Sequence, residues 1–349
     1  MSVSMQTIVR NTAQQVWRDI EWLAHSPSLI NHLARYPIAT FSNTQLQHIH
    51  QWLNSTGCLK ELAQTTKDRS RLGLYAEDLL RLTLKHSGSI ELIAQHFPIQ
   101  EQLTKGSRTI GELDYIWEDT LTQITYHWEL AVKLFLYIPE DSPIQRTHYE
   151  WQVEDNALLT NGTDTNQLNY LDRFIGTQKK DTLLRKLLHL QKKQLPLAQH
   201  PKVRETLNLD LTQSACFIKG WLFYPLHPQQ THSWQEYAVT LPKDNSWLNP
   251  NHRKGWWLMA DDFKLRLSIP NQYRWKILPR LQWLSPHQCR IEETYSTEEL
   301  WDKLQGQWDF FKQHQETPQP LLVSAMSSTD GIYYTEQHRG FVVPTEWIA

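Results

Sequence analysis

Residues 109–138 have the sequence TIGELDYIWEDTLTQITYHWELAVKLFLYI. Apolar and polar side chains alternate through residues 109–117 and again through 123–138, which is the period of a β-strand. The short connection from Glu118 to Leu121 suits a hairpin. The stretch therefore predicts two antiparallel strands, the second of which is long and has a strongly apolar centre.

The flanking segments extend this hairpin into a larger α/β unit. Residues 91–100 (ELIAQHFPIQ) predict a strand before it, and residues 72–82 carry one broad apolar stripe at helical spacing. Residues 181–195 (DTLLRKLLHLQKKQL) predict a second amphipathic helix, and residues 214–226 (SACFIKGWLFYPL) predict a fourth strand. The expected α/β core at residues 66–225 thus has the order helix, three strands, helix and strand.

The two ends of the chain are expected to form separate regions. Residues 1–65 predict an N-terminal helical segment, in which a helix at 43–53 has Asn43 as its N-cap. Nine of the 16 tryptophans fall after residue 225, so residues 226–349 are interpreted as a Trp-rich C-terminal α/β region. Its predicted elements are a strand-like segment at 255–269, a helix at 297–315 and a strand pair around 320–328 and 340–347. Residues 139–178 contain several Pro and Gly turn signals and predict an irregular excursion.

Composition restricts the class of protein. With 349 residues, of which 40% are hydrophobic, the chain is long enough for two domains or for one domain with additions. The mean hydropathy is -0.56 and no apolar run approaches the length of a membrane span, and the first residues lack the apolar block of a secretory signal. The three cysteines are too far apart to suggest a zinc site or a disulfide framework, so we expect them to be reduced and buried: Cys58, Cys216 and Cys289. We therefore expect a cytoplasmic protein with no membrane association.

The net charge of -2 requires any nucleic-acid surface to be local. Residues 176–194 provide one candidate, because they hold six Lys or Arg residues against a single Asp. Such a helix either follows a phosphate backbone or is an ordinary solvated face. The residues expected to contact phosphate are Lys179, Lys180, Arg185, Lys192 and Lys193.

Charged side chains share faces on the predicted hairpin. Glu112 and Asp114 are two residues apart on one strand, and His127, Glu129 and Lys133 are separated by even numbers on the next. Pairing of these faces would bring carboxylates and an ammonium group together. Such a cluster in an apolar strand costs several kcal/mol unless it is paired, bound to metal or open to a cleft. An ion pair between Glu129 and Lys133 and a catalytic site are both compatible with this pattern.

The order of elements and charges resembles the PD-(D/E)XK nuclease superfamily, whose core is restriction-endonuclease-like. The matching residues are Glu77 in LGLYAEDLL, Asp114 in GELDYI, and Glu129 and Lys133 in HWELAVK. More closely, these segments and GTQKKDTLLRKLLHLQKKQL (176–195) resemble the bacterial family called domain of unknown function 1853. That resemblance extends to RGFVVPTEW near the end of the chain.

The resemblance implies a metal-dependent nuclease acting on DNA or RNA. In that superfamily the acids hold a divalent cation, here Mg²⁺ or Mn²⁺ on Glu77, Asp114 and Glu129, while the lysine, here Lys133, orients or deprotonates the attacking water. Hard oxygen ligands suit Mg²⁺, and the cation with a nearby ammonium stabilises charge that develops on phosphate. Gln194 matches a helix glutamine of some of these nucleases.

One position departs from the superfamily pattern. The usual acid two residues before the lysine is replaced by Ala131, and Glu129 lies two residues earlier, about 7 Å along the strand. Either Glu112 supplies the missing ligand or metal binding has been lost. The alternative function is therefore a non-catalytic module of nuclease fold that binds nucleic acid or a protein partner.

Overall fold

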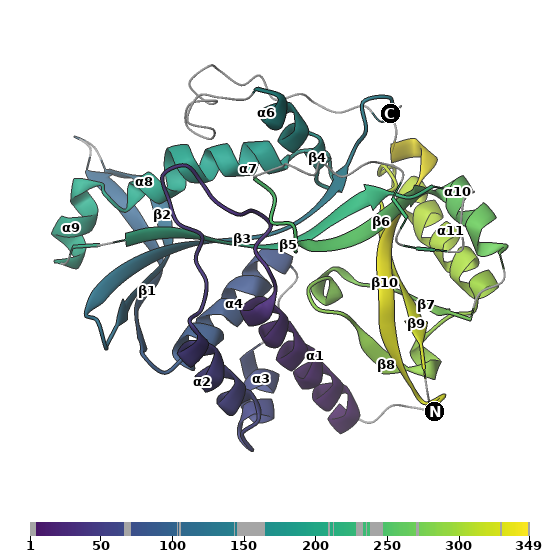
Figure 1. The fold of residues 1–349 in the computed structure, drawn as a ribbon, viewed down its shortest axis with the longest axis horizontal. Helices are drawn as coiled ribbons and strands as arrows, with labels where there is room; N and C mark the ends of the chain where they lie inside the picture. Colours follow the sequence, from purple (N-terminus) through teal and green to yellow (C-terminus); the bar gives the residue numbers. More distant parts are fainter. Residues whose placement is uncertain are drawn as a thin grey trace.

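The computed structural model describes residues 5–65, 71–102, 104, 106–142, 144, 165–208, 210–211, 213–227, 233–234, 236–237, 247–269, 272–328 and 330–347. Within these residues, strands from both halves of the chain form one mixed sheet with helices on its two faces (Figure 1). The strands are β1 (Ile90–Gln102), β2 (Ser107–Asp119), β3 (Ile124–Tyr137), β4 (Phe174–Ile175), β5 (Gln213–Pro225), β6 (Arg253–Met259), β7 (Arg274–Ile277), β8 (Gln288–Arg290), β9 (Leu321–Ser327) and β10 (Tyr333–Val343). Their order in the sheet is β1-β2-β3-β5-β6-β10-β9-β7, with β4 paired to β3 and β8 paired to β10.

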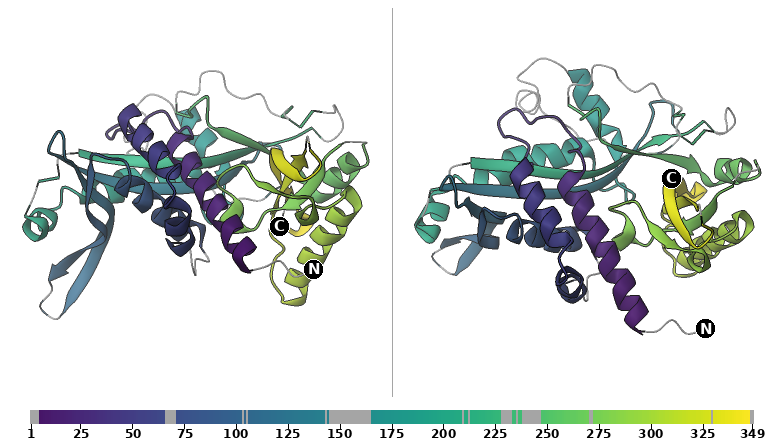
Figure 2. Two further views of the ribbon diagram at one scale, coloured as in Figure 1. Left: turned by 90° about the horizontal axis from the view of Figure 1, so that it is seen from below. Right: turned by 60° about the horizontal axis from the view of Figure 1, so that its bottom comes forward.

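The described helices lie on the two sides of the sheet, and the last of them pack beside its C-terminal strands. They are α1 (Met5–His25), α2 (Asn43–Leu53), α3 (Cys58–Thr65), α4 (Leu72–Lys85), α6 (Thr165–Asp172), α7 (Leu183–His189), α8 (Leu195–Leu197), α9 (Pro201–Leu207), α10 (Ala260–Leu267) and α11 (Thr297–Gln313). Figures 1 and 2 show α1 to α4 on one side of the sheet and α6 to α8 on the other. No helix of the described residues is both long and apolar enough to cross a membrane.

The hairpin predicted from residues 109–138 is confirmed. β2 and β3 pair antiparallel, from Asp119 opposite Ile124 to Tyr115 opposite Trp128. The predicted order of helix, three strands, helix and strand is also present as α4, β1, β2, β3, α7 and β5, with α6, β4, α8 and α9 added. Because β3 and β5 pair in parallel, the chain must cross over between them, and α6 to α9 lie in that crossover.

Alternation along β3 divides the core into two layers. Trp128, Leu130 and Leu134 belong to the buried cluster that contains the apolar stripe of α4. Ala131 and Phe135 belong to the cluster on the opposite face, together with the leucines of α7. The face that carries Glu129 and Lys133 is therefore the face covered by α7 and its continuation.

The sheet continues from the predicted core into the Trp-rich region. β5 pairs in parallel with β6, and β6 pairs in parallel with β10. The predicted strand at 255–269 is wrong in its second half, where the chain forms α10 instead. Ala260, Phe263 and Leu267 are buried at helical spacing, and two aspartates occupy the first turn, where the helix dipole favours negative charge. The division at residue 225 stays a prediction, although the sheet runs across it.

Three smaller expectations have clear outcomes. The N-cap of α2 is Ser42 and the prediction of Asn43 is wrong, because Ser42 and Gln45 form a reciprocal capping box that Asn43 cannot make. All three cysteines are free and buried, as predicted. The predicted excursion at 139–178 lies mostly outside the described residues, except for α6, β4 and short flanking pieces.

Candidate active site at the β2–β3 hairpin

Asp114 and Glu129 lie side by side at the end of the β2–β3 ladder. The backbone N–H of Leu130 donates to Oδ2 of Asp114 at 2.9 Å, and the backbone N–H of Asp114 faces Oε1 of Glu129 at 3.4 Å. They follow directly on the last ladder pair, Tyr115 and Trp128. The two carboxylates therefore share one face, as strand alternation predicts.

Glu129 is buried, and side-chain partners face both of its carboxylate oxygens. Its exposed fraction is 0%, and its Oε1 accepts a hydrogen bond from Nε2 of His127 at 2.8 Å. Its Oε2 accepts from the amide of Gln194 at 2.5 Å. Burial lowers the pKa of His127 to about 4, so this imidazole is neutral, and its Nδ1 faces the Ser214 hydroxyl at 3.2 Å. Both oxygens of Glu129 are thus already used by the protein.

The two carboxylates titrate well above the usual range for acids. Burial, followed by the charge of Glu129, raises the pKa of Asp114 to about 7. Burial raises the pKa of Glu129 to about 7, and the charge of Lys186 opposes this shift. Neighbouring acids of this kind titrate as a coupled pair. The pair therefore retains protons to higher pH than ordinary carboxylic acids do.

Lys133 pairs with Asp181, and not with Glu129 as one of the two alternatives from the sequence had it. Nζ of Lys133 lies 2.6 Å from Oδ2 of Asp181, and each side chain is 33% exposed. Positions 129 and 133 are four residues apart, or about 13 Å along an extended strand. Asp181, immediately before the N-cap of α7, is the nearer partner.

A glycine on the neighbouring strand fixes the backbone at Lys133. Gly220 of β5 is the register partner of Lys133 and has φ +149°, a conformation that favours glycine. A Cβ atom at this position would lie 1.7 Å from the carbonyl oxygen of Lys133. The close approach of β3 and β5 at the site thus requires glycine.

The helical layer contributes Lys186 and Gln194. A π-helical turn, Leu190–Gln194, follows α7 and leads into α8. Oε1 of Gln194 accepts from Nζ of Lys186 at 2.8 Å, while its amide reaches Glu129. Burial, and after it the charge of Lys133, lowers the pKa of Lys186. Lys186 was not among the predicted site residues; the spacing of eight residues between it and Gln194, close to two helical turns, was the available signal.

Glu77 approaches the site from α4, on the other side of the sheet. Its side chain is 23% exposed, and its Oε2 atom is buried without a hydrogen-bond partner among the described residues. Burial raises the pKa of Glu77, the charge of His96 opposes this, and the charge of Asp114 adds to it. Glu77 is therefore within electrostatic range of Asp114.

His96 of β1 joins this acidic edge, although the sequence did not indicate it. Its Nε2 lies 3.4 Å from Oε2 of Glu77, and its Nδ1 lies 3.2 Å from Oε1 of Glu112. The imidazole is directed there by a left-handed backbone at His96, with φ +52°. Glu112, proposed as a substitute ligand, is half exposed and turned toward His96.

The predicted phosphate-binding residues are only partly available. Lys179 and Lys180 precede α7, so the expectation that they belong to the helix is wrong; Nζ of Lys179 lies 5.3 Å from the ring centroid of Trp347. Arg185 is half-buried and donates to the carbonyl oxygen of Lys180. The exposed members of the predicted set are Lys180, Lys192 and Lys193.

The described residues of the site offer few ligands for a metal ion. In the part of the chain that the structure describes, no three His, Cys, Asp or Glu side chains are grouped so that they could hold a metal ion. Each oxygen of Glu129 already has a side-chain partner, which leaves less of its acceptor capacity for a cation. Glu77 retains a buried oxygen without a hydrogen bond and Asp114 is half-buried, so each has acceptor capacity left for a hard cation, but they approach from opposite sides of the sheet.

Comparison with known proteins gives one match. The sequence model described as "Domain of unknown function (DUF1853)" matches residues 18–343. No curated protein and no solved structure matches the chain. The matched range covers nearly the whole chain, including the β2–β3 hairpin and the C-terminal strands, so the chain belongs to the DUF1853 family.

Proposed function

We propose that the chain is a metal-dependent phosphodiesterase of the nuclease type, with a restriction-endonuclease-like core. The observation that carries this proposal is the coupled pair of Asp114 and Glu129, whose shared face also carries the ammonium groups of Lys133 and Lys186. Buried acids with strongly raised pKa values beside cations are typical of functional sites. The order of α4, β1, β2, β3, α7 and β5 supports the likeness of the core.

The carboxylates would have different roles. Asp114 would hold Mg²⁺ or Mn²⁺ together with water, and Glu77 would contribute through that water from the α4 side of the sheet, since Mg²⁺ commonly keeps several waters and uses only one or two protein carboxylates. Glu129 would act as a positioning residue, because it is enclosed by His127 and Gln194 and its Oε1 faces the Asp114 backbone. The bound cation would stabilise negative charge on the phosphate in the transition state.

The lysines would act on the opposite side of the reacting phosphate. Lys133 is one-third exposed and would orient the attacking water, as the resemblance implies for this position. Lys186 lies deeper and would add fixed positive charge near both carboxylates, which its effect on their pKa values supports. The small side chain of Ala131 lies between Glu129 and Lys133 on the same face of β3.

DNA or RNA is the proposed substrate, with the exposed lysines as backbone contacts. Lys180, Lys192 and Lys193 are exposed near the helical layer that covers the site. Contacts of this type make affinity fall steeply with salt. Charge reversal of Lys192 and Lys193 together should therefore reduce the salt dependence of nucleic-acid binding.

Cleavage of labelled DNA and RNA, single- and double-stranded, with Mg²⁺ or Mn²⁺ tests the proposal. Parent protein should cleave at least one of these substrates only with metal, and Asp114→Asn should remove cleavage. Glu118→Gln provides a matched control, because Glu118 is a half-buried acid on the same strand but pairs opposite Thr125. Equal cleavage by the Asp114→Asn variant and the parent, or no cleavage of any substrate, would contradict the proposal.

A non-catalytic module is the second candidate, and one observation favours it. Both oxygens of Glu129 have side-chain partners and Lys133 is paired with Asp181, so both groups have structural partners. This candidate predicts salt-dependent nucleic-acid binding that is unchanged by metal and by Asp114→Asn. Binding without cleavage or metal response would therefore select the module over the enzyme.

A further inference from the structure

A closed loop between β4 and α7 carries Asp181, the partner of Lys133. The backbone N–H of Gly176 donates to the carbonyl oxygen of Asp181 at 2.9 Å. The backbone N–H of Lys179 donates to the carbonyl oxygen of Gly176 at 2.8 Å. Residues 176–181 therefore form one unit, and a contact at any of them also restrains Asp181.

The 3₁₀ turn Thr345–Trp347 contacts this loop, although the two segments are far apart in the sequence. Nε1 of Trp347 donates to the carbonyl oxygen of Thr177 at 2.7 Å, across 170 residues of chain. The ammonium group of Lys179 lies 5.3 Å from the centroid of the Trp347 ring, which is within the range of cation–π attraction. The indole thus holds the loop at two points.

The contact with Trp347 accounts for an uncommon backbone at Lys179. Its φ of +56° lies in the left-handed region, which residues other than glycine seldom adopt. Such a conformation persists where the surrounding contacts determine it. The cation–π contact and the hydrogen bond to Gly176 are two such contacts, so the shape of the loop depends on the indole.

Trp347 is itself held in place by its surroundings. Its exposed fraction is 1%, and it belongs to the same buried cluster as Phe341 and Val343 of β10. Glu346, beside it in the turn, pairs with Lys312 of α11 at 2.6 Å. The turn is therefore attached both to the sheet and to α11.

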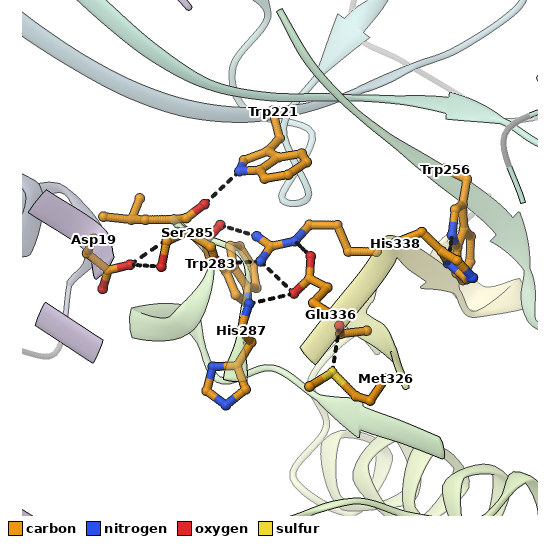
Figure 3. Close-up of polar contacts among 12 residues, drawn as sticks. Asp19, Trp221, Trp256, Trp283, Ser285, His287, Met326, Glu336 and His338 are labelled. Carbon is orange, nitrogen blue, oxygen red and sulfur yellow. Dashed lines mark hydrogen bonds and ion pairs between the residues drawn. The ribbon is translucent and has the colours of Figure 1, made fainter. Parts of the chain in front are cut away.

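The strand that leads into this turn is also anchored. Arg339 of β10 is 1% exposed, and its guanidinium makes two contacts with the carboxylate of Glu336, at 2.5 and 2.8 Å. It also donates to the carbonyl oxygens of Trp283 and Ser285. Figure 3 shows Glu336, Trp283 and Ser285 gathered around this guanidinium, with the contacts as dashed lines. Trp347 thus extends from a fixed strand toward the loop.

We infer that Trp347 is a positioning residue, which holds the 176–181 loop so that Asp181 stays paired with Lys133. Nζ of Lys133 lies 2.6 Å from Oδ2 of Asp181, and both side chains are 33% exposed. Because solvent competes with a pair of this exposure, its population depends on how firmly the backbone holds the carboxylate. The role of Lys133 in catalysis rests on the proposed function, whereas the effect of Trp347 on Lys133 does not.

Acylation of the lysines of the full chain, without metal or nucleic acid, tests the inference. The amine of Lys133 reacts only while its pair with Asp181 is open. Its labelling rate relative to that of exposed Lys193, measured by peptide mass spectrometry, therefore reports how well the pair is held. Asp181→Asn should raise this ratio up to about fivefold, the factor that corresponds to about 1 kcal/mol for an exposed pair. Trp347→Phe keeps an aromatic ring but loses the donor to Thr177, and it should produce at least half of that rise.

Trp308→Phe is the matched control. Trp308 is also buried and donates through Nε1 to a backbone carbonyl oxygen, that of Gln319 at 3.1 Å, so the variant loses the same kind of contact. It should leave the labelling ratio at the parent value. Lys179→Met keeps the indole and removes the ammonium over it, and it should raise the ratio by less than Trp347→Phe. Lys179 is half-buried, so this second variant tests the inference even if Trp347→Phe does not fold.

A double variant tests whether the effect passes through Asp181. Trp347→Phe should change the ratio little once Asp181→Asn has removed the pair, and an equal rise in both backgrounds would overturn the inference. A ratio at the parent value in both Trp347→Phe and Lys179→Met would also overturn it, as would an equal rise in Trp308→Phe. Since the measurement needs neither metal nor nucleic acid, failure of the proposed function would leave its result unchanged.

Discussion

The amide of Gln194 donates a hydrogen bond to Oε2 of Glu129 over 2.5 Å, and this contact joins the helical layer to the centre of β3. Its orientation is fixed from behind, because Oε1 of Gln194 accepts from Lys186 at 2.8 Å. The Gln194 amide group must therefore face the carboxylate. The neutral side chain of Gln194 thus bridges Lys186, a half-buried cation, and Glu129, a buried acid.

Replacing Gln194 by Leu should destabilise the fold. The change leaves Glu129 Oε2 and the Lys186 ammonium without their partner, and an unsatisfied buried polar group costs about 1–3 kcal/mol. Denaturant unfolding would measure the loss. Lys193→Ala is the matched control, since this neighbour is exposed and should change stability by less than about 0.5 kcal/mol. Equal stability of the two variants would mean that the Gln194 contacts are unimportant.

The contribution of Asp114 and Glu129 to stability should fall as pH rises toward neutrality. In the unfolded chain both acids titrate near pH 4, whereas in the folded chain the pKa values of Asp114 and Glu129 are about 7. Between these values the folded state binds more protons at these two sites, so their contribution to the free energy of unfolding decreases with increasing pH, while buried histidines such as His127 contribute with the opposite sign. Relative to the parent, Asp114→Asn should therefore make the slope of unfolding free energy against pH more positive between about pH 4 and 7. Unfolding curves at several pH values would check it, and an unchanged slope would rule out the coupled pair.

Lys133 and Asp181 should show coupling in a double-mutant cycle. We expect Lys133→Met and Asp181→Asn to interact by less than about 1 kcal/mol, because both side chains are one-third exposed. Lys133→Met combined with Glu129→Gln is the comparison pair and should show weaker coupling. Stronger coupling to Glu129 would restore the ion pair that the sequence suggested.

Gly220→Ala should be strongly destabilising. Its Cβ would overlap the carbonyl oxygen of Lys133 at 1.7 Å, which forces β3 and β5 apart and costs several kcal/mol. Gly306→Ala provides the opposite control. Gly306 lies in α11 with open space at its Cβ position, so alanine should stabilise the helix by about 0.5–1 kcal/mol. Melting temperatures that move in the same direction would contradict this account.

The sequence predicted the β2–β3 hairpin because alternation sets which side chains share a face. It therefore also predicted that Asp114 and Glu129 lie together. Alternation does not reveal which group covers that face, and the partners of Lys133 and Glu129 lie 48 and 65 residues farther along the chain. Those contacts depend on how the crossover packs on the sheet.

Two features of the site depend on local backbone geometry that sequence patterns describe poorly. The π-helical turn that carries Gln194 departs from ordinary helical spacing. His96 reaches Glu77 through a left-handed backbone, which is uncommon for residues other than glycine. The N-cap at Ser42, by contrast, is recognisable from Ser42 and Gln45 and lies one residue before the predicted Asn43.

Thermal melting with Mn²⁺ at pH 8 tests the central claim most directly, because the coupled acids are largely deprotonated there. If Glu77 and Asp114 hold a cation, the melting temperature of the parent should rise to a plateau with millimolar Mn²⁺. Asp114→Asn should lose this rise, while Glu118→Gln and Lys133→Met should keep it. No rise in the parent, or an equal rise in Asp114→Asn, would contradict the proposed metal site.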